Sequence, residues 1–361
     1  MHTVILGNGI LAASVAFRLA QRLAAKDRIT IVGKRARPGS ATLAAAAMLN
    51  SFAELEAGSL NSELDRYRFE LSRAAARIWP QFEKELVEAG APLPAGGGLE
   101  CGTYVINNAA ADDLDDENFD AIVAGLRQFR EPYEAVAPRD IPNYMPQQRH
   151  RATRALYIPG EGWINPRLVM EALDASLSHR PQVSFVDDAI ASLARQGARI
   201  GSAKTENGQT IVGDQFVLAT GATATDVLRQ SDLGIDVQRV FYGVGVSLEI
   251  RSPDFPHKKC IRTPNRGLAC GLYSVPYFTA AAQRSDHILV GASNFISPAP
   301  CPYGRLTSVD TLMRGAIEQL NHNFYRADLV RVNVGWRPTT LDTYPLLGKT
   351  SIGNLIIATG T

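Results

Sequence analysis

Short apolar runs alternate with longer amphipathic segments along this chain. Val4 to Leu6 is typical of a buried strand, Gly7 to Gly9 of a turn, and Ile10 to about Lys26 of an Ala- and Leu-rich helix. A long amphipathic helix is predicted over residues 60–90, and an acidic helix is predicted to continue to Arg130. The chain therefore begins with a strand, a glycine turn and a helix, in the order that a phosphate-binding site requires.

Strands dominate the pattern farther along. A helix is predicted to begin at Pro166, with Asn165 as its N-cap, and to lead into three strands over residues 182–196, 197–208 and 210–224. The sequence "ENGQ" is predicted to form a hairpin turn between the last two. More strands are expected beyond residue 235, then a helix over about residues 308–323 and a last apolar strand, "NLIIATG". The mixture predicts an α/β protein with discontinuous domains.

Composition narrows the class of function. The 361 residues are 45% hydrophobic and 20% charged, with a net charge of +1, as in an ordinary globular protein. Basic residues are scattered, which argues against nucleic acid or an anionic membrane as a partner. No apolar run approaches the roughly 20 residues of a transmembrane segment, and no signal peptide is recognised. We therefore expect a cytoplasmic protein that acts on a small molecule.

Cysteine and histidine spacing does not predict a metal site. Cys101, Cys260, Cys270 and Cys301 lie far apart without a CxxC pair, and the six histidines show no paired spacing. The cysteines are interpreted as reduced thiols, and a covalent cofactor attachment at one of them is the less favoured alternative.

The sequence "GNGILA" supplies Gly7, Gly9 and Ala12. In a dinucleotide-binding unit the first glycine permits the tight turn, the second lets a pyrophosphate approach the backbone, and the small third residue lets helix and strand pack closely. The alternative is a tight turn in another α/β fold. The strand before the motif and the helix after it favour the nucleotide site.

The second strand, "RITIV", lacks the acid that normally accepts hydrogen bonds from the adenosine ribose. Gly33 stands there, and Lys34 and Arg35 follow. The site could be inactive, could do without a carboxylate, or could use a basic residue to meet a 2'-phosphate, as NADP sites do. A solvated loop explains Lys34 and Arg35 equally well.

Several further segments occur in a recognisable order: "GSATLAAAAML", "GEGWINPRLVMEAL", "FVLATGA", "LYSVPY", "HILVGAS", "GWRPTTLDTYPLLG" and "NLIIATG". Together with "ILGNGILAAS" they resemble the D-amino-acid-oxidase and glycine-oxidase group of FAD-dependent amine oxidoreductases over nearly the whole chain. The resemblance implies a Rossmann-like FAD-binding domain from residues 1–85, 150–230 and 330–361. It also implies a mixed-sheet α+β substrate domain from residues 86–149 and 231–329.

The same resemblance implies the chemistry. A hydride would pass from the carbon beside an amine to noncovalently bound FAD, and water would hydrolyse the resulting imine. The substrate would be a small amine or amino acid, and O2 or another acceptor would take the electrons. An NAD(P)-dependent dehydrogenase and a flavoprotein subunit active only with a partner chain are the alternatives, and a homo- or hetero-oligomer is compatible with all three.

Site residues follow from the matched motifs and from the nucleotide pattern. The expected cofactor-binding residues are Gly7, Gly9, Ala12, Lys34, Arg35, Thr42, Ala46, Ala47, Met48, Ile190, Ala219, Thr220, Gly221 and Gly360. The expected substrate-binding or catalytic residues are Arg337, Tyr273 and Tyr242. Arg337 and Tyr273 match residues that clamp a substrate carboxylate, whereas Tyr242 lies in "RVFYGVGV", which departs from the family pattern. The apolar strand that ends at Gly360 also suggests that the native chain continues beyond Thr361.

Overall fold

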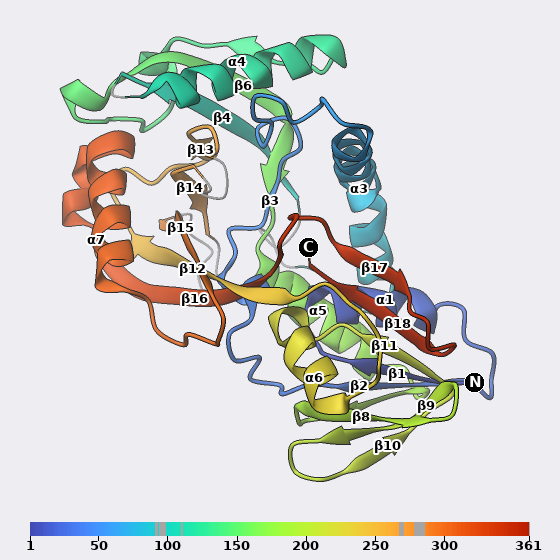
Figure 1. Ribbon diagram of the computed structural model, residues 1–361. Helices are drawn as coiled ribbons and strands as arrows, with labels where there is room; N and C mark the ends of the chain where they lie inside the picture. Colours follow the sequence, from blue (N-terminus) through green and yellow to red (C-terminus); the bar gives the residue numbers. More distant parts are fainter. Residues whose placement is uncertain (91–92, 94–98, 110, 267–270, 278–285, 361) are drawn as a thin grey trace.

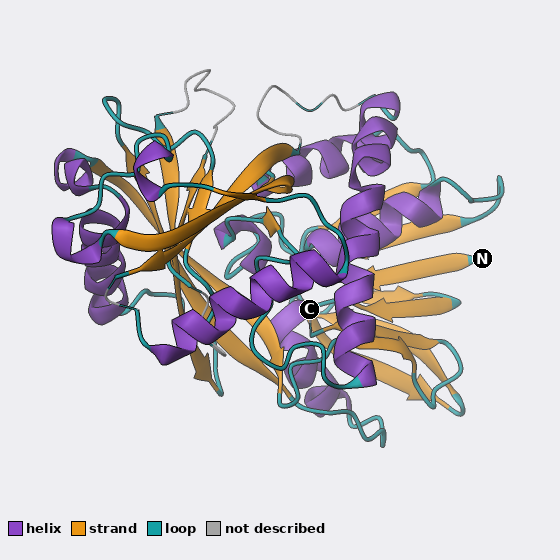
Figure 2. Cartoon of the chain, turned by 90° about the horizontal axis from the view of Figure 1, so that it is seen from above, coloured by secondary structure: helices purple, strands orange, loops and turns teal. Residues whose placement is uncertain are grey.

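The computed structural model describes residues 1–90, 93, 99–109, 111–266, 271–277 and 286–360. Cys270 and Thr361, about which the sequence makes predictions, lie outside the described residues. The described chain forms two large sheets that lie side by side, with the N-terminal strand in the smaller one (Figures 1 and 2). A mixed α/β architecture was expected, and it is confirmed.

Within the described residues, the smaller sheet has six strands and is mostly parallel. Its order is β17 (Leu346–Lys349), β18 (Leu355–Thr359), β11 (Gln215–Leu218), β1 (His2–Leu6), β2 (Arg28–Val32) and β7 (Val183–Val186). Only β17 runs antiparallel to its neighbour. The central strands are buried on both faces, which explains why "TVIL" and "ITIV" are almost continuously apolar.

Both faces of this sheet are covered. The helices α1 (Ile10–Ala20) and α5 (Pro166–Ser178) pack on one face around Phe17, which is 1% exposed. The other face is covered by α6 (Ala224–Ser231) and a three-stranded sheet of β8 (Ile190–Gln196), β9 (Arg199–Thr205) and β10 (Thr210–Val212). Truncating such a buried aromatic typically costs about 3–5 kcal/mol, so this core stabilises the whole sheet.

The larger sheet has nine strands among the described residues. Its main path is β16 (Asp328–Thr340), β12 (Val240–Arg251), β15 (His287–Ser297), β14 (Tyr273–Pro276), β13 (Cys260–Arg262), β4 (Glu100–Asn108), β6 (Ala152–Trp163) and β3 (Met48–Leu49), and β5 (Glu134–Ala135) pairs with β6. β3, β6 and most of β16 come from ranges expected for the FAD-binding domain. The domain boundaries stay a prediction.

The remaining helices are α2 (Ala41–Ala44), α3 (Glu63–Glu88), α4 (Asp113–Gln128) and α7 (Leu306–Gly315). The long amphipathic helix and the acidic helix are thus confirmed. Asp112 caps α4 by accepting a hydrogen bond from the Asp115 amide at 3.2 Å, and Asn165 caps α5 through the Arg167 amide at 3.0 Å. The predicted N-cap Asn165 is confirmed, whereas the cap Asp112 was not predicted.

Three predicted elements end or divide differently. The first helix ends at Ala20 rather than near Lys26, because the chain must turn back to pair β2 with β1, and Asp27 holds that turn by accepting from the Ala24 amide at 3.1 Å. The single strand expected over residues 182–196 is two, because β7 joins the six-stranded sheet and β8 the three-stranded one. The strand expected over residues 210–224 likewise divides into β10 and β11.

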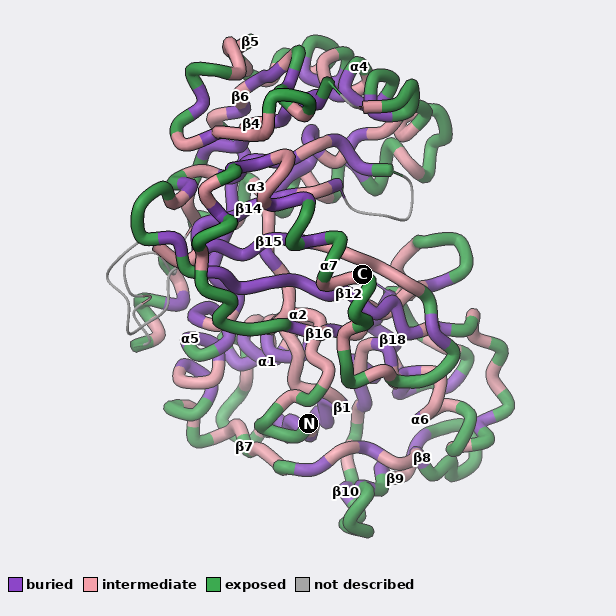
Figure 3. Tube along the Cα trace, turned by 90° about the vertical axis from the view of Figure 1, so that its left-hand side faces the viewer, coloured by how far each residue is buried: buried purple, intermediate pink, exposed green. Residues whose placement is uncertain are grey.

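The last predicted helix is also irregular. After α7 the chain forms a π-helical turn over Ala316–Leu320 and a 3-10 turn over His322–Arg326. Short 3-10 turns also occur at Pro138–Asp140, Gln148–His150 and Gly221–Thr223. Buried residues follow the strands of both sheets, and exposed residues are frequent on β10 and on the outer side of α4 (Figure 3). None of the helices in the described ranges is long and apolar enough to cross a membrane.

Candidate functional site

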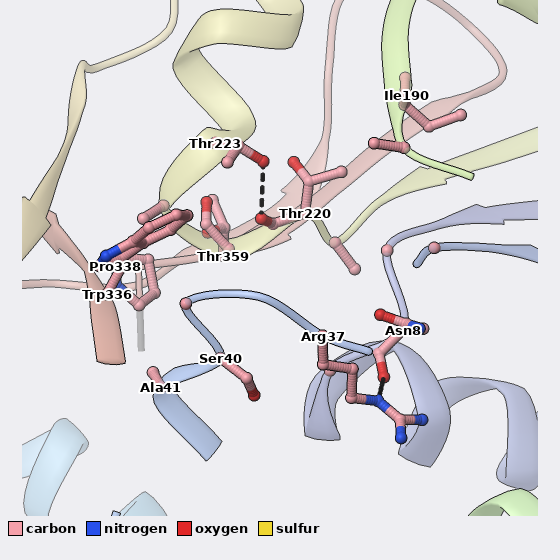
Figure 4. Close-up of a pocket in the computed structure, with 18 of the residues that line it drawn as sticks. Asn8, Arg37, Ser40, Ala41, Ile190, Thr220, Thr223, Trp336, Pro338 and Thr359 are labelled. Carbon is pink, nitrogen blue, oxygen red and sulfur yellow. Dashed lines mark hydrogen bonds between the residues drawn. The ribbon is translucent and has the colours of Figure 1, made fainter. Parts of the chain in front are cut away.

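A cavity of about 780 Å³ opens between the two sheets. Its walls come from residues 7–11, 32–34, 37–42, 189–191, 219–223, 226–227, 336–338 and 358–359, together with Ala45, Glu206, Gln230, Tyr242 and Pro300 (Figure 4). Strands β1, β2, β11 and β18 all end at it with their carboxyl termini. Ligands of open parallel sheets bind at that edge, so this cavity is the candidate site.

Gly7 and Gly9 form the turn between β1 and α1, and each has a different role. Gly7 has φ +115°, and a Cβ there would lie 2.2 Å from the Ala219 carbonyl oxygen. Gly9 is the N-cap of α1, has no side-chain cap, and a Cβ there would meet no atom within 4 Å. The first turn of α1 thus faces open space with its amide groups, an arrangement suited to a phosphate.

Gly33 ends β2 at one side of the cavity. A Cβ there would lie 2.5 Å from the Asn8 Cγ, because the Asn8 side chain crosses this position to donate to the Lys34 carbonyl at 2.9 Å. Lys34 lines the cavity and its Nζ lies 2.6 Å from the Glu206 Oε2, which is also at the cavity. Their hydrogen bond is the main reason that the pKa of Lys34 is raised.

Glu206 and Arg37 are cavity residues that the sequence reading missed. Glu206 lies at the β9–β10 turn, where an acid is unremarkable. Arg37 has φ 46°, donates through Nε to the Asn8 carbonyl at 2.9 Å, and pairs through Nη2 with Asp174 at 2.6 Å (Figure 4). Its charge therefore lies beside the glycine turn, yet no local motif marks it.

The β11–α6 connection forms the opposite wall. Thr220 Oγ1 is buried and has no hydrogen-bond partner within the described part of the chain. The Thr220 carbonyl accepts from Thr223 at 3.0 Å (Figure 4), and the Gly221 carbonyl accepts from Thr359 at 2.9 Å. Gly221 has φ +63° and open space where a Cβ would stand, so the backbone here can lie close to a ligand.

Arg337 reaches the cavity from β16. Its guanidinium lies over Gly245 of β12, where a Cβ would come within 2.9 Å of Cζ. The Nη1 atom is buried and has no hydrogen-bond partner in the described ranges. A buried cationic donor without a partner is costly, which indicates a place for an acceptor from a ligand.

Tyr242 faces the cavity from β12, and its hydroxyl donates to Asp226, another cavity residue. Burial and then the Asp226 carboxylate raise the pKa of Tyr242, so the hydroxyl stays protonated. Tyr242 also packs edge-on against Trp336 with ring centroids 5.6 Å apart. The Tyr242 hydroxyl therefore donates its single proton to Asp226 and can only accept from a ligand.

Glu54 and Arg262 form an ion pair that the sequence reading also missed. Arg262 is fully buried and donates to Glu54, and Asn265 donates to the same carboxylate at 2.6 Å. Burial alone would raise the pKa of Glu54, but Arg262, Asn265 and the charge of Arg337 hold it below its ordinary value. Glu54 thus lies within electrostatic reach of Arg337.

The predicted residues fall into two groups. At the cavity lie Gly7, Gly9, Lys34, Thr42, Ile190, Ala219, Thr220, Gly221, Tyr242 and Arg337. Away from its walls lie Ala12, Arg35, Ala46, Ala47, Met48, Tyr273 and Gly360. Ala12 is in the core beneath the glycine turn, as its packing role requires, and Gly360 has φ +79° at the end of β18.

The other residues away from the cavity have local partners. Ala46, Met48 and Tyr273 share one apolar cluster with Trp163 and Cys260. Ala47, with φ 49°, accepts from the Ile164 amide at 3.1 Å. Arg35 donates through its amide to Asp187 at 2.7 Å, and its guanidinium lies 6.0 Å from the Phe185 ring centre.

The cavity fits an elongated ligand that carries phosphate. The uncapped α1 start and the open face of Gly9 suit the phosphate, and the unpartnered Thr220 Oγ1 and Arg337 Nη1 suit acceptor groups. FAD has this composition, so the residues fit the expected cofactor. No group of three His, Cys, Asp or Glu side chains with metal-site geometry occurs in the part of the chain that the structure describes.

Comparison with known proteins supports the same interpretation. The D-amino acid dehydrogenase of Vibrio atlanticus (strain LGP32) is 28% identical over 181 residues, which are 49% of this chain and 39% of that protein. The chain spans between 39% and 54% of the length of the first curated relatives that it matches.

Solved structures match over a larger share. Glycine oxidase from Geobacillus kaustophilus superposes with a TM-score of 0.80 at 22% identity, covering 99% of this chain and 88% of that one. Iminodiacetate oxidase from Chelativorans sp. BNC1 gives 0.79 at 21%, covering 99% and 89%. The sequence model of the family described as "FAD dependent oxidoreductase" matches residues 2–361. The chain therefore belongs to the DAO family of FAD-dependent oxidoreductases, as its motifs predicted.

Proposed function

We propose that this protein oxidises the C–N bond of a small amino acid or a related carboxylate-bearing amine, with FAD as its cofactor. The observation that carries the proposal is one cavity with a phosphate-type cradle at Gly7 and Gly9 and a buried, unpartnered guanidinium nitrogen of Arg337. Glycine, iminodiacetate and D-amino acids, which appear in the names of the matched proteins, all carry a carboxylate next to an amine-bearing carbon.

FAD supplies the redox chemistry when bound, by accepting a hydride from the substrate carbon. The protein then has to position the substrate and exclude water. Arg337 would hold the substrate carboxylate through two parallel hydrogen bonds, which its planar guanidinium provides. The Tyr242 hydroxyl donates its only proton to Asp226, so its oxygen would be held at the same wall as an acceptor for a donor group such as the substrate amine.

The phosphate end would be held by the chain itself. Gly9 leaves room for the pyrophosphate against the α1 amides, and Arg37 lies beside this turn with a positive charge. Thr42 contributes its hydroxyl near the same place, where its Oγ1 lies 3.5 Å from the Ile10 amide. Lys34, Ile190 and Glu206 would surround the adenosine end.

An absorption spectrum tests the cofactor, and anaerobic bleaching tests the reaction. The purified protein, incubated with FAD and desalted, should show a flavin spectrum, and acid precipitation should release the flavin. Anaerobic addition of amino acids and N-substituted glycines should bleach the oxidised band for at least one carboxylate-bearing amine. A protein that binds no FAD, or one that retains FAD but is bleached by no such amine, would contradict the proposal.

Replacing Arg337 with Lys tests the role of the guanidinium. The charge remains but the paired hydrogen bonds are lost. The resulting decrease in kcat/KM for the carboxylate substrate should correspond to about 1–3 kcal/mol of lost transition-state stabilisation. The matched control is Arg331→Lys, because Arg331 is exposed on the same strand. Unchanged kinetics in the Arg337→Lys enzyme, with FAD still bound, would refute the assignment of Arg337 but leave the cofactor proposal intact.

A further inference from the structure

The helix α3 carries an apolar stripe on its outer surface that the site does not use. It consists of Leu64, Tyr67, Leu71, Ala74 and Ile78, here called the α3 seam. The four larger side chains are 51%, 66%, 48% and 59% exposed in chain order, and Ala74 is also exposed. α3 lies on the right of the upper part of the molecule in Figure 1. Single exposed apolar residues are common, but five in one row are not.

The spacing of the seam is that of a coiled coil. Its residues follow one another at intervals of three, four, three and four, which places them in one row along a helix. The helix is attached to the rest of the protein by other positions, with Phe69, Phe82 and Leu86 buried. The seam is therefore a second apolar face on a helix whose first apolar face is already packed against the rest of the protein.

Charged residues flank the seam in an ordered way. Glu63, Glu70, Arg77 and Lys84 are seven residues apart, so they form a row along one side of it. The row is acidic in the first half of the helix and basic in the second. Glu70 has only a 3.3 Å contact with Arg73, and Lys84 only a 3.8 Å contact with Glu88, and no ion pair of Glu63 or Arg77 occurs in the described residues.

A second α3 packed antiparallel to the first would cover the apolar seam and also pair the charges beside it. Layers of Leu71 with Ala74, Tyr67 with Ile78 and Leu64 with Gln81 would then form along about 26 Å of helix. The same register brings Glu70 beside Arg77, and Glu63 beside Lys84, of the other copy. A two-fold axis repeats each contact, so one helix is complementary to itself.

We infer that the α3 seam binds the α3 seam of a second copy of this chain in an antiparallel two-fold dimer. Arg18 and Gln21 of α1 contact Glu85, so the accessible part of the helix ends just after Gln81. The seam is therefore as long as the seam of a second copy that would pair with it. The opposite charges at the two ends of the row from Glu63 to Lys84 favour another copy, since a uniformly charged partner would match only one end of that row. The inference does not depend on the proposed function.

Sedimentation velocity of the full-length, flavin-loaded protein over a wide concentration range tests this dimer. The unmodified chain should form a reversible dimer, and Leu71→Arg should be monomeric because it places two charges in the central layers. The matched control is Leu114→Arg, since Leu114 is 43% exposed on α4 and lies outside the seam. Circular dichroism and melting of each variant report whether it is folded.

A charge exchange distinguishes this dimer from other assemblies. Arg77→Glu should weaken the dimer by placing Glu70 of one copy beside a second acid, and the combined Glu70→Arg and Arg77→Glu protein should restore it. A monomer at all concentrations, a dimer unaffected by Leu71→Arg, or no rescue by the double exchange would overturn the inference. Flotation of the unmodified protein with vesicles of mixed neutral and anionic lipid, lost in Leu71→Arg, would overturn it as well.

Discussion

Glu206 lines the cavity from the β9–β10 turn, next to the position where a dinucleotide site normally has its acid at the end of β2. Gly33 leaves that position without a carboxylate, and the Asn8 side chain occupies the space instead. The nearby Glu206 carboxylate, held by Lys34, offers an acceptor from another part of the chain. We expect it to take over the ribose contact that Gly33 cannot make.

Replacing Glu206 with Gln should therefore weaken the binding of FAD by about five- to tenfold, because a neutral amide oxygen replaces the charged acceptor. Flavin fluorescence during titration of the apoprotein measures this affinity. FMN, which lacks the adenosine, should bind both proteins equally, and Glu117→Gln on the surface of α4 should behave like the unmodified chain. Equal FAD affinity in the Glu206→Gln protein would show that Glu206 makes no contact with the ribose.

His257 is fully buried and lies away from the cavity walls. Its Nε2 donates to the Asn143 carbonyl at 3.0 Å, and its Nδ1 accepts from Ser274 in the neutral ring. Burial lowers its pKa to about 4, against the smaller, opposite influence of the Asn143 carbonyl. The folded state thus disfavours protonated His257.

A depressed pKa contributes stability above the unfolded-state value of 6.5, and that stability is lost as the pH falls toward 4. The difference corresponds to about 3 kcal/mol. Urea unfolding should show this loss in the unmodified protein, whereas His257→Gln, which does not titrate, should lack that part of the pH dependence. His179→Gln, on an exposed position, should keep the full profile. Parallel profiles for the unmodified and His257→Gln proteins would contradict this account.

At the scale of elements, the β1–α1 turn contains one glycine that the fold requires and one that only ligand binding requires. Gly7 is needed for the fold, because its φ of +115° and its contact with the Ala219 carbonyl leave no room for a side chain. Gly9 has an ordinary extended backbone and open space, so only a ligand requires it to be glycine. Few positions in the chain separate the two effects so clearly.

Gly9→Ala should therefore leave the melting temperature of the apoprotein almost unchanged and reduce FAD affinity at least tenfold, because its methyl group occupies the space of the pyrophosphate. Differential scanning calorimetry and flavin titration measure the two quantities separately. Gly353→Ala is the control, since its added methyl also meets no atom within 4 Å but lies away from the cavity. Normal FAD binding by the Gly9→Ala protein would show that the pyrophosphate does not bind at this turn.

Helix starts were predictable from sequence because their signals are local. Asn165 before Pro166 was predicted as the cap of α5, and it accepts from the Arg167 amide two residues on. The end of α1 was not predictable, because the residues after Ala20 have good helix propensity and only the pairing of β2 with β1 stops them. The division of residues 182–196 also follows from pairing, since β7 and β8 join different sheets.

At the scale of the whole molecule, motifs predicted the part of the site that is contiguous in sequence. Gly7, Gly9 and Thr220 belong to such motifs, and they meet at the cavity. Arg37 and Glu206 reach it only through tertiary structure, so no spacing rule could have identified them. Tyr273 was expected beside Arg337 but lies with Ala46 and Trp163 away from the cavity wall, so its role stays a prediction.

The strand order of the six-stranded sheet has a consequence for synthesis. β1 pairs with β11, and β11 with β18, so the sheet remains open at β11 until residues 355–359 have left the ribosome. At roughly 5–20 residues per second, the 137 residues from Leu218 to Leu355 take about 7–27 s. During this interval a nascent chain exposes an apolar strand edge that favours chaperone binding or aggregation. Because Ala358 and Thr359 also form part of the cavity wall, the cavity is complete only after these residues have been synthesised.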